Sequence, residues 1–187
     1  HSSFVVRPVK RKALDMAVQA KKSTPQRAFV LHSYAYSESS LIVDLFTLDN
    51  GRMAAIAKGA KRPYSQLRPV LMPFQRIAVG FGSKRGDDAE VWLLRQAEWA
   101  GGPAFCGGDA LLPGFYLNEL LMKLMARHDP HPALFDAYAL TLPALAGADD
   151  VRAPSALRAF ELTLLREIGL LPELSRATLT LQPLRPD

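Results

Sequence analysis

The clearest chemical signal in this chain is a run of basic residues with no carboxylate among them. Between Gly51 and Gly86 there is no aspartate or glutamate, and the cations are Arg52, Lys58, Lys61, Arg62, Arg68, Arg76, Lys84 and Arg85. Each lysine or arginine that neutralises a phosphate releases condensed counterions, so an uncompensated row of cations is typical of nucleic-acid binding. A solvated basic surface is the alternative interpretation, because charge alone is a weak motif.

Aromatic residues near this basic stretch could add base stacking, which contributes about 1–3 kcal/mol per base. Tyr64 lies inside the stretch, where stacking and simple surface exposure are both open interpretations. Tyr34 and Tyr36 are expected in a polar loop after the first strand. The other aromatic residues considered are expected in the core or covering it: Phe29, Phe46, Phe74, Trp92 and Trp99.

No arrangement of residues in the sequence indicates catalysis. Nucleophile-elbow, phosphate-loop, dinucleotide-binding and zinc-protease motifs are all absent. The histidines His32, His128 and His131 are expected to be structural. A single cysteine, Cys106, excludes an internal disulfide and a multi-cysteine zinc site, and is expected to be buried and inert. We therefore expect no enzyme activity, metal or cofactor.

Composition is that of a globular protein with an uneven charge. The chain has 187 residues, 49% of them hydrophobic, and a formal net charge of +5. Basic residues exceed acidic ones by six in 1–27 and by two in 28–102, but acidic residues exceed basic ones by three in 103–187. No apolar run approaches the roughly 20 residues of a membrane helix. A cytoplasmic, nucleoid-associated protein whose two halves have different partners is expected.

The basic residues must be positioned by a set of short strands. Alternating and β-branched segments predict strands over 27–33, 40–47, 52–59, 70–81 and 89–99, with a hairpin turn at Asp49-Asn50-Gly51. No helical pattern is long enough for a crossover between parallel strands. Five short strands therefore predict a small closed barrel of the OB type over residues 27–102.

After Gly101-Gly102-Pro103 the apolar period becomes helical. Helices are predicted over 111–129, 132–147 and 155–169, with Pro143 ending, kinking or locally breaking the second and Gly169 at the end of the third. The fold class is thus α+β, a five-stranded barrel followed by an all-helical domain at 103–187. Residues 1–26 are expected to form a flexible basic arm with a marginal helix at 13–22, and 177–182 a short strand.

Several separated motifs together resemble one family. AFVLHSYAYSESSLIVDLFTLDNGRMAAIAKGAKRP, LMPFQ, GFYLNELL, HDPHPALFDAY and ALRAFELTLLREIGLLPEL resemble, in order, the bacterial recombination mediator family RecO. The resemblance covers about Arg27 to Leu174. It implies a non-enzymatic DNA repair protein of the RecF pathway that binds single- and double-stranded DNA and anneals strands. With RecR, such proteins help RecA replace the single-strand binding protein SSB.

The resemblance also implies two sets of site residues. DNA contacts are expected at Arg52, Lys58, Lys61, Arg62 and Arg68, to which the basic stretch adds Tyr64, Lys84 and Arg85. The acidic tail of SSB is expected on the helical domain at Arg158, beside Leu157, Phe160 and Leu164. An arginine next to a hydrophobic slot suits such a tail, although Phe160 and Leu164 have the simpler alternative of being core residues.

The sequence departs from the family pattern in two ways. Some members carry a four-cysteine zinc module after the LLPEL-like segment, where this chain has SRATLTLQPLRPD, so no zinc is expected. The resemblance also implies that a C-terminal portion of the helical domain is missing here. Two other functions remain open: an adaptor that binds SSB or RecR without nucleic acid, and an RNA-binding OB protein.

Overall fold

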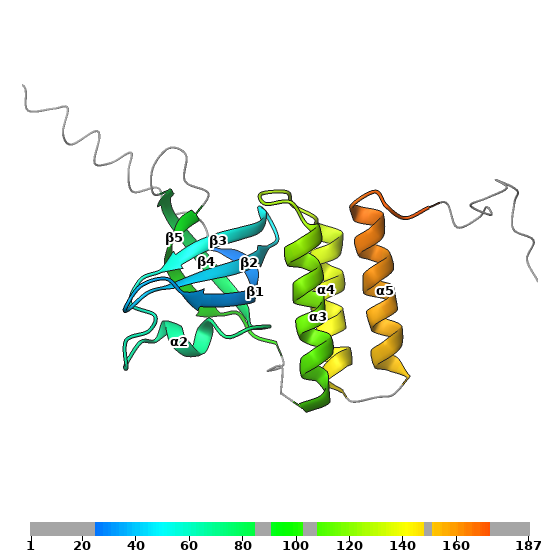
Figure 1. The fold of residues 1–187 in the computed structure, drawn as a ribbon, viewed down its shortest axis with the longest axis horizontal. Coiled ribbons are helices and arrows are strands. Elements are labelled where there is room, and N and C mark those ends of the chain that lie inside the picture. Colours follow the sequence, from blue (N-terminus) through cyan, green and yellow to red (C-terminus); the bar gives the residue numbers. More distant parts are fainter. Residues whose placement is uncertain (1–24, 85–90, 103–107, 148–150, 173–187) are drawn as a thin grey trace, which may run out of the picture.

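The computed structural model describes residues 25–84, 91–102, 108–147 and 151–172. Five strands come first, followed by three long helices (Figure 1). The expected arm helix at 13–22, the strand at 177–182 and Cys106 lie outside the described residues. The elements are β1 (Gln26–Ala35), β2 (Leu41–Thr47), β3 (Gly51–Ala57), α2 (Leu67–Val70), β4 (Arg76–Lys84), β5 (Val91–Trp99), η1 (Gly108–Ala110), α3 (Leu111–Leu124), α4 (Pro132–Ala146) and α5 (Arg152–Glu167).

The strands close into a barrel in the order β1-β2-β3-β5-β4, with β4 pairing back onto β1. All neighbours are antiparallel except β3 and β5. This is the predicted five-stranded OB barrel, and it is confirmed. Alternate residues point inward, and the inner core contains Ala28, Val30, Val43, Leu45, Met53, Ala55, Ile77, Val79 and Leu94.

The strand limits differ from the predicted ones in two informative places. β1 extends to Ala35, so Tyr34 lies on the strand rather than in the predicted loop. β4 begins at Arg76, and residues 70–75, predicted to be its first half, form the end of α2 and a turn. Phe74 takes a positive φ of 70° after Pro73, which has no N–H to donate, so a regular strand cannot form there.

The helices also begin and end at slightly different residues from those predicted. α3 ends at Leu124 instead of 129, because Met125 is already extended. α4 continues through Pro143 to Ala146. Of the three effects predicted for this proline, an end to the helix is therefore wrong. α5 begins at Arg152, three residues early, since Pro154 in the first turn loses no intrahelical hydrogen bond. Gly169 has φ 73° and follows α5, as its predicted position requires.

A second hydrophobic core joins the barrel to the helices. Phe29 and Phe46 point out of the barrel, and their rings lie 5.1 and 5.5 Å from that of Phe135 on α4. Phe74 belongs to the same core, so the three phenylalanines are buried as predicted. Trp92 packs against the inner barrel core, also as predicted. The prediction for Trp99 is wrong, since 61% of this residue is exposed.

A bulge in β1 provides a polar link within this second core. The register of β1 on β2 shifts between Val30 and His32, which leaves the Leu31 carbonyl outside the ladder. Asn118 of α3 donates its side-chain N–H to that carbonyl at 2.7 Å. Tyr138 of α4 donates its hydroxyl to the Asn118 Oδ1 at 2.5 Å. The buried amide therefore connects β1, α3 and α4.

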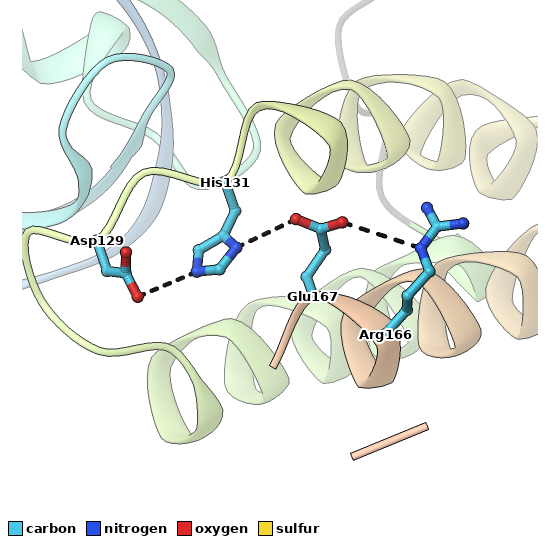
Figure 2. Close-up of polar contacts among 4 residues, drawn as sticks. All are labelled: Asp129, His131, Arg166 and Glu167. Carbon is cyan, nitrogen blue, oxygen red and sulfur yellow. Dashed lines mark hydrogen bonds and ion pairs between the residues drawn. The ribbon is translucent and has the colours of Figure 1, made fainter. Parts of the chain in front are cut away.

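Another polar contact joins the start of α4 to the end of α5. Figure 2 shows the His131 ring between the carboxylates of Asp129 and Glu167, at 3.2 Å from each. Glu167 also lies 3.9 Å from the Arg166 Nε. His131 thus has the structural position that the sequence predicted for it.

Candidate nucleic-acid interface

Two loops meet at the end of the barrel farthest from the helices (left in Figure 1). The turn after β1 and the loop after β3 are joined by Lys61, whose backbone N–H donates to the Ser39 carbonyl at 3.0 Å. The Lys61 Nζ also donates to the Ser37 carbonyl, at 3.0 Å. Between the loops is a shallow hollow of about 560 Å³, lined by Tyr36, Ser37, Ser39, Ser40, Ile56, Lys58, Gly59 and Arg62.

The predicted DNA contacts in this loop are accessible. Lys58, Lys61, Arg62 and Arg68 are all exposed, and Tyr64 is 94% exposed. Gly59 has φ 73°, which allows the tight turn closed by the Arg62 N–H on the Gly59 carbonyl. We call Lys58, Lys61, Arg62, Tyr64 and Arg68 the basic loop. Lys84 is the last residue of β4, and Arg85 lies outside the described residues.

Arg52, the remaining predicted contact, lies apart from the basic loop. It sits near the start of β3 opposite Phe46, at the end of the barrel that faces the helices. The segment 125–131 between α3 and α4, which we call the α3–α4 segment, runs beside it. The His128 N–H donates to the Arg52 carbonyl at 3.0 Å, and Arg52 and Arg127 form a parallel β-bridge.

The side chains around Arg52 form a partly buried charged cluster. The Arg127 guanidinium lies 3.4 Å from the carboxylate of Asp44, whose side chain is only 8% exposed. Burial lowers the pKa of Arg52, and the neighbouring Arg127 charge lowers it further. Asp44 partly offsets this effect. The cluster thus places two like charges close together with one carboxylate nearby.

Aromatic rings extend the outer face of the barrel from this cluster towards the hollow. The rings of His32 and Tyr34 are stacked, with centroids 5.9 Å apart and planes at 30°. Both residues are exposed. Burial raises the pKa of Tyr34, and the nearby Asp44 carboxylate raises it further. The phenol therefore stays protonated near neutral pH and can donate a hydrogen bond.

The sequence prediction missed Arg127, Asp44 and His32 as members of this face. Arg127 lies in the helical half, outside the basic stretch, and only the packing of the α3–α4 segment brings it beside β3. In the sequence, Asp44 looks like an ordinary polar residue of a strand with alternating polarity. No local signal indicates either residue, although the Asn50-Gly51 turn signal correctly placed the start of β3.

The residues predicted for the SSB tail separate into two groups. Phe160 and Leu164 are 1% and 2% exposed and belong to the helical core, so the simpler alternative holds for them and they offer no surface to a peptide. Leu157 is partly buried and Arg158 is exposed. Arg158 pairs with Glu161 at 2.5 Å, and this hydrogen bond raises the pKa of Arg158. Tyr116 of α3 also donates to Glu161, at 2.9 Å.

Two further features concern metals and membranes. Within the residues that the structure describes, no three histidine, cysteine or carboxylate side chains gather as a metal site would require. None of the described helices combines the length and apolar character needed to cross a bilayer.

Two family models match the chain. The model described as recombination protein O N terminal matches residues 22–102, and the one described as recombination protein O C terminal matches residues 108–186. The first therefore covers the barrel with the basic loop, and the second covers the helices.

Curated relatives are similar over most of the chain. The protein of Polaromonas naphthalenivorans named DNA repair protein RecO is 55% identical over 91% of this chain and 66% of its own length. Those of Polaromonas sp. (strain JS666) and Variovorax paradoxus, with the same name, are 54% and 52% identical over 89% and 90% of the chain. The chain spans 65% of each of these two relatives.

Proposed function

The chain belongs to the RecO family of recombination proteins, and on this premise we propose that it is a non-enzymatic DNA-binding protein of recombinational DNA repair. The observation that carries the proposal is the basic loop. It presents four exposed cations and Tyr64 beside a hollow at the end of the OB barrel farthest from the helices. A basic groove with an aromatic platform is how OB barrels hold single-stranded nucleic acid.

The expected behaviour is affinity that does not depend on sequence and falls steeply with salt. If the four loop cations and Arg52 each neutralise a phosphate of single-stranded DNA, log K falls with log salt at a slope of about −3.5. Changing Lys58, Lys61 and Arg62 together to alanine flattens that slope by about 2. Fluorescence anisotropy of a labelled poly-dT oligomer across a salt series measures both values.

A matched control separates the loop from net charge. The variant with Arg95, Lys123 and Arg166 changed to alanine also loses three positive charges, but from exposed positions outside the loop. Its slope is expected to stay close to that of the unchanged protein. If both triple variants flatten the slope equally, the basic loop is not the interface. A competing RNA oligomer that binds more tightly than DNA of matched sequence would instead favour an RNA-binding protein.

The family resemblance supports a second role on the helical domain. Arg158 and the partly buried Leu157 are the accessible members of the predicted site for the acidic SSB tail. A tail carboxylate would have to replace Glu161 as the partner of Arg158. The Arg158→Ala variant should weaken binding of an SSB-tail peptide while leaving poly-dT binding unchanged. Peptide binding without any DNA binding would favour the adaptor alternative.

Strand annealing, the assistance of RecA on SSB-coated DNA and the partnership with RecR complete the proposed role. They require the DNA-binding barrel and the SSB-binding helices to act on the same substrate. Residues 1–26 carry additional positive charge and would add a contribution without sequence preference.

A further inference from the structure

We infer that the barrel and the α3–α4 segment together form a phosphate-binding site at their junction, built from Arg52 and Arg127. The inference rests on the proposed DNA-binding function and extends it, because it places part of the nucleic-acid interface on the helical half of the protein. A DNA strand that runs along β3 would then contact the basic loop at one end and the junction at the other.

The backbone holds the two arginines side by side. The α3–α4 segment adds to the edge of β3 through the Arg52–Arg127 bridge and the His128 hydrogen bond to the Arg52 carbonyl. At Gly51 the approach is closest, since a Cβ there would lie 1.9 Å from the Asp129 carbonyl oxygen. Neither arginine needs a large backbone movement to share one anion.

The charges of the cluster are unbalanced. Asp44 is the only carboxylate that the described part of the chain places within ion-pair distance of Arg127, and Arg52 has none. The Arg52 Nε and one terminal nitrogen of Arg127 are buried and donate no hydrogen bond to the described residues. The Asp44 Oδ1 is likewise buried without a hydrogen-bond partner, so the cluster holds two unpaired donor nitrogens and one unpaired acceptor oxygen. Buried donors normally have partners, and this cluster is short of an acceptor. An oxyanion with several acceptor oxygens fits the two guanidinium groups.

The position of the cluster favours a nucleic-acid phosphate. Arg52 and Lys58 are six residues apart in β3 and its following turn, which corresponds to about 20 Å of strand. A stretch of this length accommodates several nucleotides, as expected of an OB barrel. The stacked His32 and Tyr34 rings lie on the same outer face, where bases between the two phosphate contacts would pass.

The test removes the carboxylate of Asp44. If the arginines bind phosphate, this should strengthen DNA binding; if Asp44 and Arg127 form a purely structural ion pair, it should not. Asp44→Asn removes the competing carboxylate at nearly constant shape. It should tighten poly-dT binding up to about fivefold, since an ion pair whose arginine is partly exposed contributes about 1 kcal/mol. The double variant Asp44→Asn/Arg127→Gln should reverse the gain and flatten the salt slope by about 0.7 relative to Asp44→Asn.

Controls keep folding and net charge separate from binding. Arg166→Gln removes one exposed charge from α5 and should leave the slope unchanged. Arg127→Lys preserves the charge and should preserve the slope while weakening binding, because lysine lacks the planar fork. A thermal melt of each variant establishes that it is folded.

The outcomes distinguish failure of the junction site from failure of the proposed DNA-binding function. If Asp44→Asn leaves poly-dT binding unchanged or weakens it in a folded protein, the junction site is refuted. If Asp44→Asn/Arg127→Gln keeps the full slope of Asp44→Asn while the triple alanine variant of the basic loop flattens it, the junction site fails and the proposed function stands. Absence of poly-dT binding by the unchanged protein would overturn both. A loss confined to acidic-peptide binding would assign the cluster to a protein partner and refute the phosphate site.

Discussion

Replacing Asn118 by leucine should strongly destabilise the fold, although the two side chains have similar volumes. Asn118 is 1% exposed and connects the carbonyl left free by the β1 bulge to the hydroxyl of Tyr138. Leucine fills a similar volume but can neither donate to Leu31 nor accept from Tyr138. Both of those groups would then be buried without a partner.

The expected loss follows from those two groups. A buried polar group without a hydrogen bond costs about 1–3 kcal/mol, and removing the amide itself recovers part of that cost. We therefore expect the free energy of unfolding to fall by about 3 kcal/mol. For a protein of this size, that change lowers the melting temperature by about 6–12 °C.

Chemical denaturation and thermal melting followed by circular dichroism measure the loss. Gln96→Leu is the matched control, because its amide makes only an exposed hydrogen bond to Glu98, at 2.9 Å, and its effect should stay within about 0.5 kcal/mol. Tyr138→Phe alone should cost about 1 kcal/mol, and the double variant with Asn118→Leu should cost less than the two single variants added together. If Asn118→Leu is as harmless as the control, or if the two losses are simply additive, the buried amide does not join the strand to the helices.

Three other predictions concern the ionisation of Tyr138, the backbone at Gly51 and the ring of Tyr64. Burial raises the pKa of Tyr138 above that of an unfolded tyrosine, so its contribution to stability is fully present below about pH 10 and is lost as pH rises beyond that value. Alkaline unfolding curves of Tyr138→Phe should therefore fall less steeply, by up to about 1.4 kcal/mol per pH unit, and identical slopes would contradict this. Gly51→Ala should cost about 3 kcal/mol or more in denaturant unfolding, because its Cβ would meet the Asp129 backbone. Gly59→Ala has the same positive φ but only a flexible arginine nearby, and should cost about 1–2 kcal/mol, so equal losses would refute the contact argument. Tyr64→Ala should weaken poly-dT binding by about 1–3 kcal/mol without changing the salt slope, while Tyr64→Phe should bind normally; an unaffected alanine variant would remove Tyr64 from the interface.

Local patterns in the sequence were enough to predict the barrel. Alternation of apolar residues gave the five strands, and the Asn50-Gly51 turn gave the β2–β3 hairpin. The pattern did not predict which core each apolar residue joins. Phe29 and Phe46 point outward from the barrel and are buried only because the helices cover them. Burial on the outer face of a strand depends on a partner distant in sequence, and alternation carries no information about that partner.

The site was predictable only where it is local. The basic loop is a continuous stretch, and its exposed side chains lie together as expected. Arg127 was missed because it is 75 positions from Arg52 in the sequence and only tertiary packing brings the two residues together. For Phe160 and Leu164, the spacing that suggested a hydrophobic slot is also the spacing of a core-facing stripe, and the structure has the stripe. Helical periodicity alone cannot separate these two cases.

The shared hydrophobic core has a consequence for how the protein folds and how it could be divided. The two family models separate at residues 102 and 108, yet Phe29, Leu31, Phe46 and Phe74 on one side of that boundary are buried by helices on the other. A barrel fragment would expose these side chains as an apolar patch prone to self-association. The boundary in sequence is therefore not a boundary in cooperativity, and barrel and helices are expected to melt in one transition.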